Sequence, residues 1–136
     1  MAAASRALPQ IRTRQWQPTG ADDDMTITLV DGSASIGATE YSLPNASTTL
    51  TPKTDDCVLQ TFIDFANMAA GDEYRIRIRE KINAGTQRIV YDATVEGVQG
   101  APFITPSLIL GDGWDVTVQK VSGTDRTIAW SLRKTT

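Results

Sequence analysis

The sequence predicts an all-β protein, an antiparallel β-sandwich of the jelly-roll kind with about eight strands. Three observations carry this prediction. Apolar and polar residues alternate with a period of two in most segments after residue 24, turn residues separate these segments at short spacing, and none reads convincingly as a helix. The 136 residues suit one domain. We place that domain at 25–136 and expect an extended N-terminal arm at 1–24.

The arm differs in composition from the rest of the chain. Pro9 and Pro18 favour extended chain over helix, and the run of three aspartates before Met25 is typical of a solvated hinge. Two interpretations stay open, a floppy terminus and an arm that docks on a neighbouring protein. For docking, the arm offers the residue types that anchor interfaces, which are Arg6, Arg12, Arg14 and Trp16.

Four strands are expected in the first part of the domain. Asp31-Gly32 would end the first strand, Pro44 the second and Pro52 the third, and the fourth is longer. Their expected ranges are 25–29, 40–43, 48–51 and 57–65.

The strand expected at 57–65 has apolar side chains on both faces. Leu59 and Ile63 share one face, whereas Val58 and Phe62 share the other. This pattern is typical of a strand that is covered on two sides. Cys57, the chain's single cysteine, begins this strand and reads as a small buried group, not as a nucleophile.

The clearest alternation lies in the next segment. A period of two places one set of side chains on the core and the other set on the opposite face. The core set is Tyr74, Ile76, Ile78 and Ile82, and the opposite set is Arg75, Arg77, Arg79 and Lys81.

A hairpin is expected to follow, with a turn at 83–86 in which Gly85 takes positive φ. Pairing Ile82 with Gln87 sets Ile78 against Tyr91 and places other apolar residues opposite one another. The same register sets Arg77 opposite Asp92.

The remaining chain predicts a connection, a short strand and a second hairpin. Phe103 and Ile104 in the connection at 97–106 are expected to pack over the core, and 107–110 forms the short strand. The second hairpin pairs the segments around Trp114 and Trp130, and both tryptophans fall in phase with core residues.

Composition excludes several classes of function. A net charge of −3 gives no general attraction to nucleic acid or to an anionic membrane, and no apolar run is long enough for a transmembrane helix. Without histidine, Ser-His-Asp and Cys-His catalysis are excluded, and one cysteine completes neither a disulfide framework nor a metal site. We therefore expect no catalytic, cofactor-binding or metal-binding residues, and a protein that binds other proteins.

The cation set on the segment 74–82 has two interpretations. It is either an exposed sheet face that pairs with Asp92 and Glu96, or a surface for an acidic protein partner. Nucleic-acid binding would need aromatic residues between the cations, and Tyr74 lies on the opposite face. The candidates for partner binding here are Arg75, Arg77 and Arg79.

Four stretches of the chain resemble small structural proteins of tailed phages. They are Glu40-Tyr41-Ser42-Leu43-Pro44-Asn45-Ala46-Ser47-Thr48-Thr49-Leu50, Ala69-Ala70-Gly71-Asp72, Gly113-Trp114-Asp115-Val116-Thr117 and Gly123-Thr124-Asp125-Arg126-Thr127-Ile128-Ala129-Trp130-Ser131-Leu132-Arg133. The resemblance covers roughly residues 25–134 and excludes the arm. The chain is also similar to capsid cement proteins, or decoration proteins, which have a jelly-roll fold and clamp neighbouring major capsid proteins.

This resemblance implies synthesis in the bacterial cytoplasm and residence on the capsid surface of the virion. It implies the major capsid protein as partner and a homodimer at a symmetry axis, with no cofactor, nucleic acid or membrane. Two alternatives stay open: a tail or neck protein of the same virion, and a carbohydrate-binding β-sandwich, which would need exposed aromatic residues on a sheet face.

Overall fold

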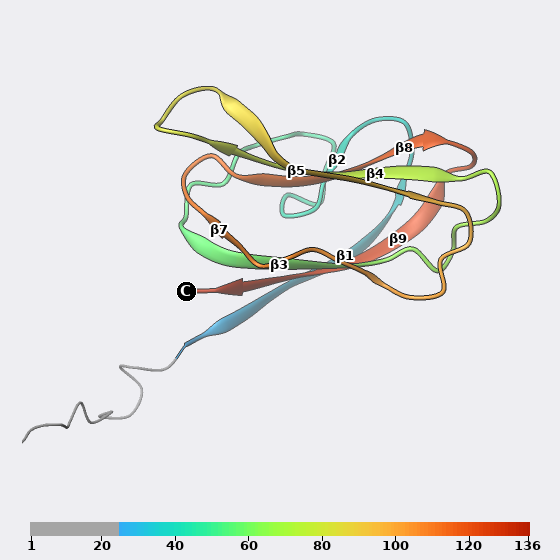
Figure 1. Ribbon diagram of the computed structural model, residues 1–136, viewed down its shortest axis with the longest axis horizontal. Helices are drawn as coiled ribbons and strands as arrows, with labels where there is room; N and C mark the ends of the chain where they lie inside the picture. Colours follow the sequence, from blue (N-terminus) through green and yellow to red (C-terminus); the bar gives the residue numbers. More distant parts are fainter. Residues whose placement is uncertain (1–24) are drawn as a thin grey trace, which may run out of the picture.

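The computed structural model describes residues 25–136, and all regular elements in this range are strands (Figure 1). Residues 1–24, with the arm and its boundary at residue 24, lie outside the described residues. The nine strands are β1 (Ile27–Ile36), β2 (Tyr41–Ser42), β3 (Cys57–Asp64), β4 (Glu73–Lys81), β5 (Gln87–Glu96), β6 (Phe103–Ile104), β7 (Leu108–Leu110), β8 (Asp115–Ser122) and β9 (Arg126–Thr135).

The strands form two antiparallel sheets that stack as two layers (Figure 1). One sheet has the order β1-β9-β3-β6, and β7 pairs with β3 beside β6. The other has the order β2-β8-β4-β5. Apolar side chains at alternate positions of both sheets fill the space between the layers, so the predicted sandwich is confirmed.

The strand order is that of a jelly roll. The first strand pairs with the last, β2 with β8, and β4 with β5, while β3 pairs with both β6 and β7. Because β6 and β7 lie along successive parts of β3, they act as one interrupted strand, which gives eight strand positions in all. These pairs are nested along the chain: the outermost strands pair with each other, then the next two, and so on to β4 and β5. A long hairpin wound across two sheets has this nested pairing.

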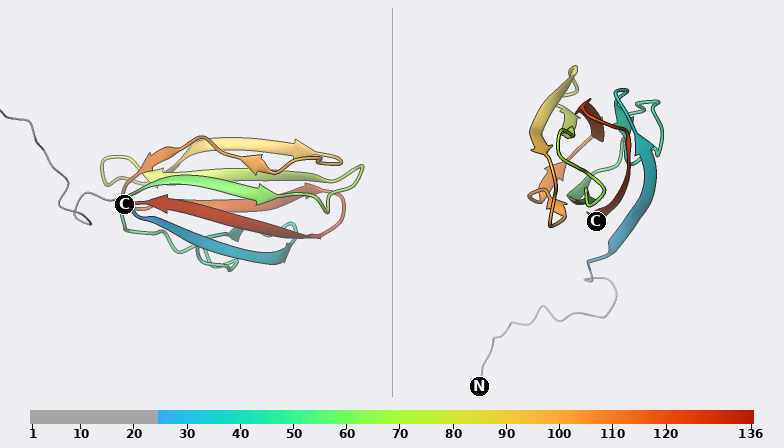
Figure 2. Two further views of the ribbon diagram at one scale, coloured as in Figure 1. Left: turned by 90° about the horizontal axis from the view of Figure 1, so that it is seen from below. Right: turned by 90° about the vertical axis from the view of Figure 1, so that its right-hand side faces the viewer.

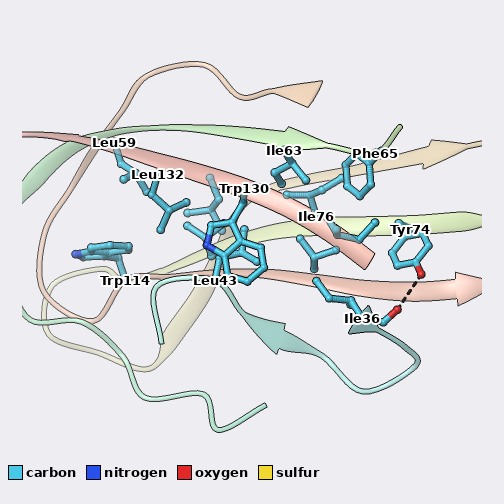
Figure 3. Packing of buried hydrophobic residues seen from close by; sticks show 14 of the residues in the cluster. Ile36, Leu43, Leu59, Ile63, Phe65, Tyr74, Ile76, Trp114, Trp130 and Leu132 are labelled. Atoms are coloured by element: carbon cyan, nitrogen blue, oxygen red, sulfur yellow. Dashed lines mark hydrogen bonds between the residues drawn. The ribbon is translucent and has the colours of Figure 1, made fainter. Parts of the chain in front are cut away.

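The core confirms the expected inward faces. Ile76 and Ile78 are fully buried, and Trp114 and Trp130 are 1% and 5% exposed. Figure 3 shows Ile76, Trp114 and Trp130 among the buried side chains that fill the space between the sheets. Tyr74 keeps its hydroxyl satisfied by donating a hydrogen bond of 2.8 Å to the carbonyl oxygen of Ile36.

The first strand does not end at Asp31-Gly32, as the sequence led us to expect. β1 continues through Gly32 to Ile36, in unbroken register with β9. A close contact explains why a glycine stands within the strand: a Cβ atom at Gly32 would lie 2.5 Å from Cζ2 of Trp130. Glycine is required there for packing and does not terminate the strand.

No strand forms at 48–51, so that prediction is wrong. The chain instead makes a turn in which Ser42 and Ser47 exchange backbone hydrogen bonds. The Asn45 side chain donates to the Thr51 carbonyl oxygen at 2.7 Å and to Ser42 Oγ at 2.8 Å. A side-chain amide thus satisfies backbone groups that a sheet would otherwise pair.

The hairpin of β4 and β5 has the predicted register from Tyr74 to Ile78, including Arg77 opposite Asp92. Beyond Ile78 a bulge shifts the pairing, so that Lys81 and not Ile82 lies opposite Gln87. Ile82 therefore falls in the turn with 57% exposure and does not join the core. Positive φ occurs at Asn83 and Ala84 instead of Gly85.

The second predicted hairpin is wrong. β8 belongs to one sheet and β9 to the other, so the turn at 123–125 carries the chain between the layers. Contacts distant in sequence hold this corner: Asp72 accepts hydrogen bonds from the Thr124 backbone N–H at 2.9 Å and from Arg126 Nε at 2.7 Å. Alternation alone fits a hairpin and a sheet-to-sheet corner equally well.

Candidate protein-binding surface

The cation set lies where the sequence placed it. Arg75, Arg77 and Arg79 project from β4 on the outer side of the β2-β8-β4-β5 sheet, opposite the buried Ile76 and Ile78. The geometry of their partners decides whether this surface is free to bind.

Arg79 is already engaged within the molecule. Its guanidinium forms an ion pair with Glu40, and both side chains are only 18% exposed. Glu40 also accepts a hydrogen bond from the Thr117 hydroxyl. Burial works against ionisation of Glu40, yet the hydrogen bonds and positive charge of Arg79 outweigh it and lower the pKa of this carboxyl.

The neighbouring cations are also close to carboxylates. Arg75 lies 4.0 Å from Asp92 as a half-exposed pair, and Arg77 is flanked by Thr117 and Asp92 in the strand register. Within residues 25–136 no ion pair reaches Glu96, contrary to expectation. Asp115 at the start of β8 is buried, and its Oδ1 accepts a hydrogen bond of 2.7 Å from Ser42 Oγ of β2.

A second surface carries exposed apolar side chains that no other part of the described chain covers. On the outer side of the β1-β9-β3 sheet, the strand registers align Ile27, Thr135, Val58 and Ile109 in one row across four strands. Ile109 is 85% exposed and Ile27 is 62% exposed. Figure 2 shows β1, β9 and β3 side by side on this layer. We define the outer apolar face as Ile27, Leu29, Val58, Phe62, Ile104 and Ile109.

An arginine lies over the middle of the outer apolar face. The Arg133 guanidinium carbon is 4.0 Å from the centroid of the Phe62 ring, a cation–π contact. Shallow hollows flank this pair, one of them bordered by Ile27, Val58 and Thr135. An aromatic ring, an arginine and apolar edges are the residue types that dominate protein interfaces.

The expectation that β3 is covered on both sides is wrong for the described chain. Leu59 and Ile63 are buried on the inner side, whereas Val58 is 38% exposed and Phe62 is half-buried on the outer side. No described strand lies over this outer side. The apolar pattern on both faces therefore identifies a face that residues 25–136 leave without a cover.

Sequence reasoning missed most of this surface. Ile27 and Leu29 alternate with polar residues as core residues do. Val30, the next residue after Leu29, packs against the core, so the alternating Ile27 and Leu29 point to the outer side. Ile109 stands in a short apolar run in which a single residue faces out. Arg6, Arg12, Arg14 and Trp16 lie outside the described residues.

Other chemistry finds little support among residues 25–136. Cys57 is buried, and burial followed by the charge of Asp55 raises the pKa of its thiol to about 11, which disfavours the reactive thiolate. No group of three or more Cys, Asp or Glu side chains in this range could hold a metal ion. In the same range no helix has the length and apolarity needed to cross a membrane.

Comparison with known proteins adds little. No protein-family model and no curated protein matches the sequence. A solved structure titled "Structure of infectious bursal disease virus Gx strain" aligns with 97% of this chain at 13% identity and a TM-score of 0.38. The chain spans 38% of that protein's length. A similarity of this degree carries no argument about function, and the jelly roll rests on the strand order above.

Proposed function

We propose that this chain is a structural protein of a tailed-phage virion. In this proposal it acts as a capsid cement or decoration protein that binds the shell of major capsid protein and stabilises it. The chain would be made in the host cytoplasm and reside on the capsid surface, with no catalytic role. The sequence resemblance and the jelly roll support this role, and the outer apolar face carries it.

The physical argument is the free energy of covering that face. Solvent-exposed apolar rows on a small domain mark interaction sites, because each square ångström of apolar surface removed from water contributes roughly 25 cal/mol. The strand registers hold the backbone of the row from Ile27 to Ile109 in place, so little backbone conformational freedom is lost on binding. Arg133 above Phe62 would supply a central anchor.

The N-terminal arm would extend the same contact. It joins the described chain at Met25, which borders a hollow together with Val58 and Ile109 of the outer apolar face. Trp16 and the arginines Arg6, Arg12 and Arg14 would then reach a neighbouring subunit and tie it to the first. The cations Arg75, Arg77 and Arg79 become secondary candidates, because Glu40 of the same chain already engages Arg79 and Asp92 lies 4.0 Å from Arg75.

The alternatives have less support. A tail or neck protein could use the same surface, and the number of copies in the virion separates it from a shell protein. A carbohydrate-binding sandwich needs exposed aromatic residues, but Trp114 and Trp130 are both buried in the core.

The proposal is tested by binding of the full chain to shells of the encoding phage that lack it. Ile109→Asp places a charge at the most exposed position of the outer apolar face. Val98→Asp is the matched control, since Val98 is 74% exposed in a loop outside that face. We expect Ile109→Asp to weaken shell binding roughly tenfold or more and Val98→Asp to leave it unchanged.

Both variants should fold with unchanged melting temperatures, because neither site is buried. Equal shell affinity of the wild type and Ile109→Asp would exclude the outer apolar face as the contact surface. No binding by the wild-type chain would contradict the cement role itself.

A further inference from the structure

The four sheet edges formed by residues 25–136 differ in how well they are protected. β2 has only two residues, and β6 and β7 are short segments separated by a stretch that contains Pro106. β5 carries a bulge and the charged residues Arg88, Asp92 and Glu96. Short strands, proline, bulges and charges are the features that prevent edge strands from pairing with other chains.

β1 lacks these features. It is ten residues long, contains no proline, keeps an unbroken register with β9, and has Asp31 as its single charged residue. The side chains that it places on the outer side, from Ile27 to Ser35, are all exposed. A long, regular and nearly uncharged edge is a template for strand pairing.

The backbone groups of β1 that are free to pair can be assigned. Thr136 N–H donates to the Thr26 carbonyl oxygen at 3.3 Å, and this pair continues the register of β1 with β9. Residues in an antiparallel ladder alternate between hydrogen-bonded and non-hydrogen-bonded pairs. The even-numbered residues of β1 therefore bond to β9, and the N–H and C=O groups of the odd-numbered residues point to the open edge. Among the backbone hydrogen bonds of residues 25–136 outside the strand ladders, none involves the N–H or C=O groups of these odd-numbered residues from 27 to 35.

We propose that β1 pairs antiparallel with β1 of a second copy of the chain, about a two-fold axis at Gly32. This register sets Asp31 opposite Ser33 of the partner copy and Leu29 opposite its Ser35. Centring the axis on Asp31 would place two carboxylates face to face, and centring it on Ser33 would shorten the overlap. Gly32 gives the longest overlap that avoids a like-charge pair.

The side chains on the inner side also match. Val30 would lie opposite Ala34 of the partner copy, and both residues already pack against the hydrophobic core from partly buried positions. Each copy would cover the apolar side chain that the other leaves at its sheet edge. An isologous contact of this kind is self-complementary, which an edge for an unrelated chain need not be.

The joined sheet would have a consequence for shell binding. Ile27 and Leu29 of both copies would lie on the same side of one continuous sheet, so two outer apolar faces would form a single surface. Two linked faces bind with higher avidity than one. The pairing itself does not rest on the proposed function, because it can be measured in the absence of any shell.

The test is the oligomeric state of the full chain by sedimentation equilibrium, with two variants of one exposed residue. Ser33→Asp places a negative charge opposite Asp31 of the partner copy, twice by symmetry, whereas Ser33→Lys places a positive charge there. We expect a wild-type dimer, a dissociation constant raised roughly tenfold by Ser33→Asp, and one equal to or lower than wild type for Ser33→Lys.

Both variants should unfold at the wild-type temperature under conditions in which all are monomeric, since Ser33 is exposed. A wild-type chain that stays monomeric at roughly 100 μM, where a dimer with a micromolar dissociation constant would form, overturns the proposal. A dimer that Ser33→Asp and Ser33→Lys affect equally overturns it too, because the contact then lies elsewhere. A wild-type chain that forms the dimer but does not bind the shell would count against the proposed function alone.

Discussion

Gly32 is the residue on which the packing of β1 against the core depends. The indole of Trp130 occupies the space that a Cβ atom would need, with ring carbons at 2.5 and 2.9 Å from that position. Gly32→Ala should therefore lower the free energy of unfolding by about 1–3 kcal/mol, the usual cost of overpacking a core. Denaturant unfolding measures this change.

Ser33→Ala is the control for this prediction, because Ser33 is the adjacent exposed residue of the same strand. Its free energy of unfolding should stay within about 0.5 kcal/mol of the wild type. If Gly32→Ala is as stable as Ser33→Ala, the Trp130 side chain has room to move and the close contact does not matter.

Asp72 links stability to pH at the corner between β8 and β9. Hydrogen bonds from the backbone N–H groups of Thr124 and Ala69, and then from Arg126, lower the pKa of this carboxyl to about 2. Because the pKa is lower in the folded state, the stabilisation is present above the usual value of 3.8 and is lost as pH falls from there towards 2.

Asp72→Asn should therefore lower the melting temperature at pH 7, and the difference from the wild type should shrink as pH falls through this window. Thermal unfolding across the acid range measures both effects. A difference in melting temperature that stays constant from neutral to acid pH would show that the charge of Asp72 does not matter.

At the scale of single strands, the cations on the outer side of β4 differ in their role: one belongs to a mostly buried ion pair and another is half-exposed. Arg79 and Glu40 are mostly buried together, whereas the pair of Arg75 with Asp92 is half-exposed. Arg79→Ala should lower the free energy of unfolding by about 1–2 kcal/mol, because Glu40 loses its charged partner. Arg75→Ala should cost less than about 0.5 kcal/mol.

Chemical denaturation of the two variants side by side compares these values. Equal stability of Arg79→Ala and Arg75→Ala would contradict the structural role of the Arg79–Glu40 pair. In that case Arg79 would be available to a partner, and the cation set would stand beside the outer apolar face as a candidate surface.

Alternation in the sequence predicts the individual strands well, but it predicts poorly which strands pair with one another in a sheet. It placed β4 and β5 with the register from Tyr74 to Ile78, since local turn chemistry and cross-strand pairs act together there. It missed the sheet change between β8 and β9 because the Asp72 contacts that hold this corner are distant in sequence. It ended β1 early because Gly32 reads as a turn residue until Trp130 is seen beside it.

At the scale of the whole molecule, the jelly roll decides which apolar residues are core and which are surface. Sequence reasoning named Arg75, Arg77 and Arg79 as candidates for partner binding because their alternation can be read within a single strand. The outer apolar face is assembled from β1, β3, β6 and β7, which only the strand order brings together. The two-sided apolar pattern of β3 was a local sign of this face.

The same strand order places the exposed edge of β1 beside the outer apolar face. A dimer through β1 and a shell contact through that face would then act together, each copy contributing one half of a bivalent surface.

The number of copies of this chain per virion, measured by quantitative mass spectrometry against the major capsid protein, tests the proposed role most directly. A protein that covers the shell is predicted to be present on the order of hundreds of copies, in a simple ratio to the major capsid protein. A count of about six or twelve would contradict a shell role and place the chain in the tail or neck.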